Sequence, residues 1–127
     1  MSSSEATQSV MPIVKYHGVK TAGNLIAMKF YEGKRLHEQT VVTVDDCSLK
    51  PRFDLCLFDF NGFEWGYESS GTMQLSLALL ADHLNNDKQA VSSCGAFARA
   101  LVAKLPDEGW RLSSEQIEAA LISEKMV

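Results

Sequence analysis

The chain of 127 residues is long enough for one domain, which should bury roughly two-thirds of the surface that its unfolded form exposes. A hydrophobic fraction of 46% and a charged fraction of 22% are typical of a globular protein. The formal net charge of −4 at pH 7 argues against a histone-like role and against binding to an anionic membrane surface.

Residues 1–11 are mostly small and polar, which predicts a disordered tail because such residues cannot offset their ordering entropy by burial. Residues 12–127 then form a single α+β domain. The tail lacks the cationic start and apolar run of a secretion signal, and the apolar run at 75–81 is far shorter than the ~20 residues that span a bilayer. We expect a cytoplasmic protein with no membrane segment and with reduced thiols, because no CxxC pair occurs among Cys47, Cys56 and Cys94.

The N-terminal half contains four runs that favour β-structure. Residues 13–20 and 24–34 are separated by only three residues, which is short enough for a hairpin connection. Residues 39–46 are rich in β-branched side chains, which suit a pleated surface, and residues 53–60 form a further strand candidate. These runs predict a mainly antiparallel sheet.

An Asn-Gly pair at residues 61–62 favours a tight hairpin turn, because both residue types tolerate positive φ. Such a turn would place Phe60 opposite Phe63 and Phe58 opposite Trp65. We expect Trp65 and Phe63 to lie in the core, because the helix that follows needs a broad apolar surface to pack against.

A first helix is predicted from Ser70 onward, with Ser70 as the N-cap. Met73, Leu77, Leu80 and Leu84 repeat at helical spacing, and further apolar residues widen this face until most of the helix is expected to be covered.

Two more helices follow in the sequence. Residues 85–87 supply a stop and a new cap, the apolar face of the second helix extends over residues 90–105, and Pro106 ends it. Ser113 and Gln116 have the spacing of a reciprocal capping box at the start of the third helix. The predicted fold class is therefore α+β, with a mainly antiparallel sheet in the N-terminal half covered by about three C-terminal helices.

Residues 66–72 form the candidate binding loop. Backbone N–H groups and the positive end of a helix dipole lie there beside hydroxyl groups, a combination that suits an anion. The loop lacks the Lys of a phosphate-binding loop, and its negative charge opposes an anion, so turn geometry and helix capping form the competing interpretation. The candidate ligand or partner contacts are Tyr67, which should reach solvent with its hydroxyl, Glu68, Ser69 and Ser70.

No catalytic residue, metal site or cofactor is predicted. His17, His37 and His83 share no metal-ligand spacing. Asp82 and His83 are adjacent, and Cys94 is a nucleophile type, but nothing else in the sequence completes an acid–base pair or a triad.

The sequence resembles a family of small uncharacterised bacterial, archaeal and phage domains. The resemblance depends on FEWGYESSGTMQLSLALLADHL at 63–84 and LVAKLPDEGWRLSSEQI at 101–117, which are similar to a pattern FEWGYGGSGPAQLALALL followed by VAxLPxxxWxLT, and it covers about residues 14–122. Glu68 stands where the pattern usually has Gly, and Thr72 where it often has Pro. The resemblance implies a shared fold and carriage by phages or plasmids, and no activity.

Two classes of function remain. The first is a non-catalytic module that binds an unidentified protein partner, with the acidic middle of the chain as its candidate surface. The second is an enzyme or a small-ligand or anion-binding domain that uses residues 66–72. Nucleic acid is an improbable partner because of the acidic charge. The acidic segment, residues 53–87, contains no Lys or Arg, and its carboxylates are those of Asp54, Asp59, Glu64, Glu68, Asp82 and Asp87.

Overall fold

The computed structural model describes residues 20–21, 24–25 and 28–124. The expected tail at 1–11 and most of the strand expected at 13–20 lie outside these residues. A four-stranded antiparallel sheet has the order β5-β4-β3-β6 and is formed by β3 (Phe30–Leu36), β4 (Gln39–Val44), β5 (Cys47–Ser48) and β6 (Gly109–Ser113). The short strands β1 (Lys20–Thr21) and β2 (Asn24–Leu25) pair antiparallel, as expected for a hairpin.

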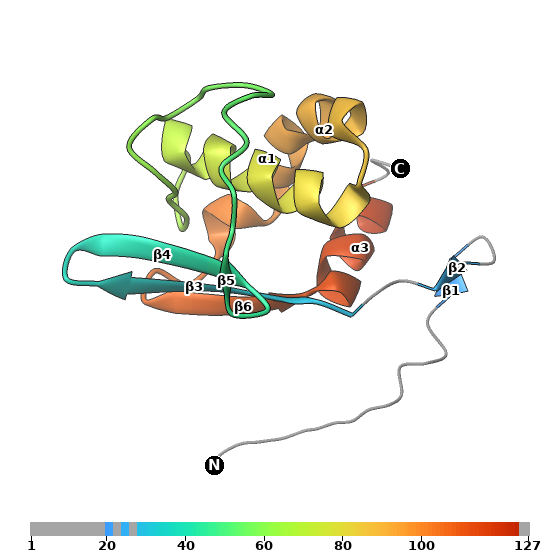
Figure 1. Cartoon of the computed structure of the whole chain (residues 1–127), viewed down its shortest axis with the longest axis horizontal. Helices are drawn as coiled ribbons and strands as arrows, with labels where there is room; N and C mark the ends of the chain where they lie inside the picture. The colour runs from blue at the N-terminus through green and yellow to red at the C-terminus, as the bar shows by residue number, and fades with distance from the viewer. Residues whose placement is uncertain (1–19, 22–23, 26–27, 125–127) are drawn as a thin grey trace, which may run out of the picture.

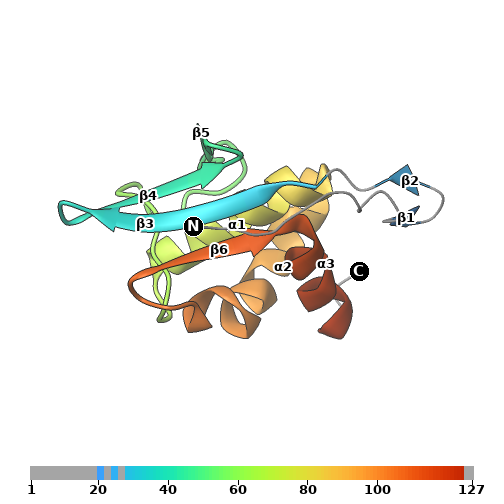
Figure 2. The ribbon, with the colours of Figure 1, turned by 90° about the horizontal axis from the view of Figure 1, so that it is seen from below.

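The helices lie together on one face of the four-stranded sheet (Figure 1). They are α1 (Ser70–Leu84), α2 (Asp87–Ala100), the 3-10 helix η2 (Val102–Lys104) and α3 (Ser114–Ser123). Figure 2 looks onto the sheet from below the molecule of Figure 1, with the helices behind the sheet. The predicted α+β class is confirmed, and the core lies between the two layers.

Alternation along β3 decides which side chains enter this core. Tyr31 and Gly33 are buried, and Arg35 shares their face, whereas Phe30 and Lys34 are exposed on the open face. Since successive side chains of a strand point to opposite faces, a shift of one residue would expose the core set.

Two tight turns set the register of the sheet. His37 and Glu38 join β3 to β4 with φ of 51° and 68°, and Asp45 and Asp46 join β4 to β5 with φ of 48° and 70°. Positive φ at both central positions matches the right-handed twist of the flanking strands. The strand predicted at 39–46 therefore ends at Val44, where the second turn begins.

The prediction of a strand at 53–60 is wrong, because this segment forms turns and irregular loop structure. Its backbone groups pair with the buried side chain of Gln74 on α1 instead of with another strand. Gln74 Nε2 donates to Pro51 O at 2.7 Å and Cys56 O at 3.1 Å, and its Oε1 accepts from the amides of Phe58 at 2.7 Å and Asp59 at 3.1 Å.

The hairpin predicted at residues 61–62 is absent for the same reason, since no strand flanks either side of it. Phe60 does not pair with Phe63 across a hairpin. Its ring stacks on Phe53, with ring centroids 5.7 Å apart, while Phe63 is partly buried against the core.

The start of α1 lies one residue earlier than predicted. Ser69, not Ser70, is the N-cap: its backbone is extended, and its Oγ accepts a hydrogen bond from the Thr72 amide at 3.1 Å. The helix is the central one of the molecule, as expected, with most of its side chains buried. It packs against both α2 and η2.

The later helices start as predicted. Asn86 caps α2, and Ser113 and Gln116 form the reciprocal capping box of α3. The second helix ends at Ala100, because Leu101 leaves helical geometry before η2 begins. Strand β6, immediately ahead of α3, was not anticipated. Among the described residues, every helix is too short or too polar to cross a membrane.

Candidate functional site

Arg35 on β3 joins the two segments that the sequence resemblance singled out. Its Nε donates to Asp107 O at 2.7 Å, and its NH2 nitrogen lies 3.0 Å from Glu64 Oε1 and 3.2 Å from Asp107 Oδ1. The guanidinium also lies over the ring of Trp65, 4.5 Å from its centroid. The hydrogen bond to Glu64 raises the pKa of Arg35 further, so the cation is firmly held.

Trp65 is fully buried, which confirms that it is a core residue. Its Nε1 donates to Asp107 O at 3.1 Å, and its ring meets that of Trp110 edge to face, with centroids 5.6 Å apart. Gly66, with φ of 88°, donates its amide to Val102 O at 3.1 Å. The aromatic-Gly segment and the LPDEGW segment of this chain therefore pack on one another.

In the predicted binding loop, residues 66–72, the hydroxyls of the two serines and of Thr72 all bind other groups of the protein. Ser69 Oγ lies 3.0 Å from Thr72 Oγ1, which also bonds to Tyr67 O, so both side chains serve the helix cap. Ser70 Oγ points to a neighbouring loop and donates to Asp59 Oδ2 at 2.9 Å. Tyr67 is 52% exposed, as expected.

Glu68 is exposed at the start of α1, where its charge suits the helix dipole. The four candidate contacts thus lie together at one end of α1. Two of them, Tyr67 and Glu68, face solvent, Ser69 is a capping residue, and Ser70 links this end of α1 to the preceding loop.

The loop that Ser70 contacts is an apolar surface that the sequence analysis assigned to a strand. Phe53 is 37% exposed, Leu57 is 57% exposed and Phe60 is 76% exposed. We call these three side chains, with Tyr67, the loop surface. One sequence signal could have indicated this surface: residues 53–60 contain more large apolar side chains than one face of a strand can bury.

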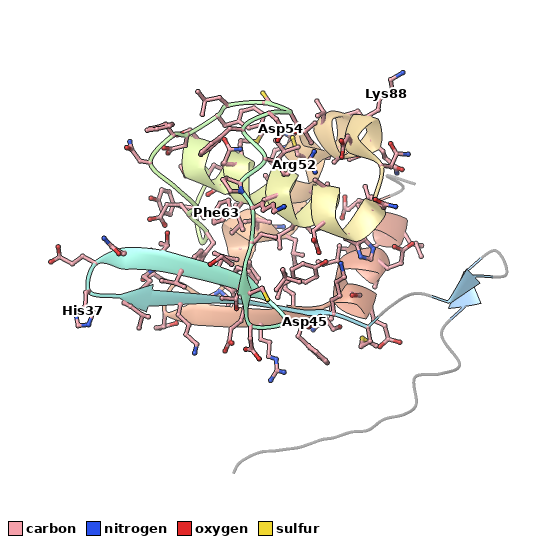
Figure 3. The ribbon with its side chains drawn as sticks, viewed as in Figure 1. His37, Asp45, Arg52, Asp54, Phe63 and Lys88 are labelled. Atoms are coloured by element: carbon pink, nitrogen blue, oxygen red, sulfur yellow. The ribbon has the colours of Figure 1, made fainter. Side chains whose placement is uncertain are left out.

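Arg52 fixes the base of this loop to the N-terminal end of α2. Its Nε and NH2 nitrogens each lie 3.0 Å from a carboxylate oxygen of Asp54, and NH2 lies 3.1 Å from Asp87 Oδ2. Figure 3 shows Arg52 and Asp54 together where the loop passes over α1. Hydrogen bonding to Arg52 lowers the pKa of Asp54, so this exposed carboxylate stays ionised.

Asp82 and His83 do not form an acid–base pair, because they bind different elements. Asp82 Oδ2 accepts from Tyr31 Oη at 2.7 Å and from Lys29 Nζ at 3.2 Å, whereas His83 Nε2 lies 2.7 Å from Glu118 Oε1 on α3. These contacts hold α1 to the sheet and to α3.

The three cysteines differ in exposure. Cys47 is exposed, Cys56 is half-buried and Cys94 is buried, and all three are free thiols. Burial raises the pKa of the Cys94 thiol, which keeps it protonated and unreactive. Within residues 20–21, 24–25 and 28–124, no group of three or more His, Cys, Asp or Glu side chains is placed to hold a metal ion.

Fold and site together define a small two-layer α+β domain with a structured apolar loop beside the start of its central helix. The chain belongs to a family of unknown function, DUF6166, whose model matches residues 31–123. No curated protein and no solved structure matches the chain. The expected membership of a family without an assigned activity is confirmed over this range.

Proposed function

We propose that this domain is a non-catalytic module that binds a protein partner through the loop surface. The observation that supports this most directly is that Phe53, Leu57 and Phe60 are exposed on a backbone that the buried Gln74 side chain holds with four hydrogen bonds. Single exposed apolar residues need no explanation, but several on one short loop, with Phe53 and Phe60 stacked on each other, do.

The fixed backbone matters for affinity. A partner that binds a mobile loop must supply the free energy of ordering it, whereas a loop already held in place avoids this cost. Aromatic side chains add large contact area with few rotatable bonds, which makes them effective anchors at interfaces. Phe53 and Phe60 are already stacked on each other in the free domain.

The alternative function, in which residues 66–72 bind an anion or small ligand or form an enzyme site, has weaker support. The Ser69 hydroxyl is engaged by Thr72, and the Ser70 hydroxyl lies against the Asp59 carboxylate. Glu68 adds a second negative charge beside this helix start. An anion would have to displace these bonds and overcome like-charge repulsion.

Two further parts of this proposal depend on the sequence alone. Carriage of the domain by a phage or plasmid follows from the resemblance, and a cytoplasmic location follows from the unpaired cysteine pattern. Fractionation of the host cell and inspection of neighbouring genes would test them independently of binding.

Site-specific photo-crosslinking tests the binding function. A photoreactive phenylalanine analogue is placed at Phe60 and, as a control, at Ile122, which is 59% exposed on α3. We expect position 60 to yield a discrete protein adduct in cells of the source organism, and we expect Leu57→Ser to weaken it. Thermal melts of each variant should match the parent, because these side chains are exposed.

The proposal fails if position 60 yields no adduct, or if positions 60 and 122 yield the same set of adducts. Loss of the position 60 adduct in the presence of phosphate or sulfate, with Ser70→Asp restoring it, would instead favour the anion site.

A further inference from the structure

We propose that the partner segment bound by the loop surface is apolar and basic, with large aliphatic or aromatic side chains flanked by Lys or Arg. This inference depends on the proposed function and adds the chemistry of the partner. It comes from the charges that surround the exposed apolar side chains.

The arginines near the loop surface are outnumbered by their acidic partners. Arg52 contacts the carboxylates of both Asp54 and Asp87, and Arg35 contacts those of both Glu64 and Asp107. The Arg35 cluster therefore keeps an excess of negative charge after its ion pairs form, whereas the positive charge of Lys50 also acts on Asp54 beside Arg52.

Asp59 immediately precedes Phe60, and within the part of the chain that the structure describes no cation forms an ion pair with its carboxylate. Its oxygens accept from two uncharged donors, the Ser70 hydroxyl at 2.9 Å and the Asn61 amide at 2.8 Å. Hydrogen bonds from neutral groups leave the net charge of a carboxylate in place. Glu68 is also exposed, just before the N-cap of the same helix.

Negative charge next to an apolar surface selects among partners. Complementary charge speeds encounter and fixes register, while like charge opposes the wrong partner. A second copy of this chain would bring Asp59 and Glu68 against the same carboxylates, so pairing of two loop surfaces is disfavoured. A partner segment with positive flanks meets no such repulsion.

Fluorescence polarisation with synthetic peptides tests this directly. The first probe is a labelled peptide with leucines flanked by lysines, the second has glutamates in place of the lysines, and the third keeps the lysines but has serines in place of the leucines. We expect the first to bind at least about tenfold more tightly than either of the others, with a preference over the glutamate peptide that decreases as salt rises.

Variants of the loop surface and its neighbouring carboxylates test which side chains cause the peptide preference. Asp59→Asn with Glu68→Gln should reduce the preference for lysine over glutamate, and Phe60→Ser should weaken binding of the lysine peptide. Glu115→Gln on α3 should change neither result, because it lies exposed on a different element. Melting curves confirm that each variant is folded before binding is measured.

Equal affinity for the lysine and glutamate peptides, or no binding of the lysine peptide, overturns the inference. So does a dimer in sedimentation velocity that Phe60→Ser converts to monomer. The crosslinked partner separates this inference from the proposed function: an adduct at position 60 whose contact segment is acidic or uncharged leaves the binding function standing and removes only the claim about charge.

Discussion

Gln74 shows how one buried polar side chain can determine the shape of a whole loop. It is fully buried on α1, and its amide pairs with backbone groups of four residues between 51 and 59. A buried amide that satisfies all of its donors and acceptors stabilises a single arrangement, because any other arrangement leaves polar groups unpaired. Gln74 therefore holds the backbone from which Phe53, Leu57 and Phe60 project.

Replacing Gln74 with Leu should therefore destabilise the domain by about 2–4 kcal/mol, since the volume is kept but buried backbone groups lose their partners. Urea denaturation measures the loss, and hydrogen exchange should show faster exchange at the Phe58 and Asp59 amides. Gln39→Leu, at an exposed position on β4, is the control and should stay within about 0.5 kcal/mol of the parent. Equal stability of the two variants would contradict this role.

Gly33 allows the Trp110 ring to lie directly on β3. A Cβ at this position would lie 2.4 Å from Trp110 Cε2, which is too close for any real contact. Gly33→Ala should thus cost about 1–3 kcal/mol through overpacking of a buried ring. Gly95→Ala on α2 should have the opposite sign and stabilise by about 0.5–1 kcal/mol, because its nearest contacts are at ordinary distances. Thermal melts should show a lower melting temperature than the parent for Gly33→Ala and a higher one for Gly95→Ala.

At the scale of elements, the start of α1 explains the sequence pattern of adjacent serines. Ser69 satisfies the Thr72 amide as the N-cap, and Ser70 is the first helical residue, with its hydroxyl directed to the loop. The two adjacent serines therefore have different roles. Ser69 caps the N-terminus of α1, and Ser70 links α1 to the loop that contains Asp59.

Ser69→Ala should lose about 1 kcal/mol of stability, because the Thr72 amide is left without its cap, and Ser69→Asp should restore most of it. Ser70→Ala should cost less, about 0.5 kcal/mol or below, since its partner Asp59 can bind water instead. Chemical denaturation of the three variants gives the order. A larger loss of stability for Ser70→Ala than for Ser69→Ala would show that Ser70 is the N-cap, as the sequence predicted.

At the scale of the whole molecule, Tyr31 and Asp82 join the sheet to the central helix. The Tyr31 ring is buried between the two layers, and its hydroxyl donates to Asp82 Oδ2 at 2.7 Å. Burial, followed by this hydrogen bond and the nearby negative charge, raises the pKa of the Tyr31 hydroxyl above its ordinary value.

This shift predicts an alkaline loss of stability. In the unfolded chain the hydroxyl releases its proton near pH 10, before the native state does, so the contribution to stability is complete below about pH 10 and is lost as pH rises above it. Denaturation curves from pH 8 to pH 11 should fall less steeply for Tyr31→Phe than for the parent. Tyr67→Phe, at a half-exposed position, should follow the parent, and a fall that Tyr31→Phe leaves unchanged would refute the assignment.

The sequence by itself determined the features that depend on local chemistry. Helical spacing of apolar residues identified α1 and α2, side-chain capping chemistry located the start of α3, and β-branched content identified β4. The core position of Trp65 and the exposure of Tyr67 were also correct. These signals act within a few residues, so one chain is sufficient to read them.

The tertiary structure decided the features that depend on distant partners. Residues 53–60 have the composition of a strand, but the Gln74 amide, far along the chain, takes their backbone hydrogen bonds, so the apolar side chains become a surface instead of one face of a sheet. Strand β6 forms because β3 offers it a partner, and Arg35 is placed over Trp65 only by the fold. Pairing between segments is a property of three-dimensional contact, which local pattern cannot specify.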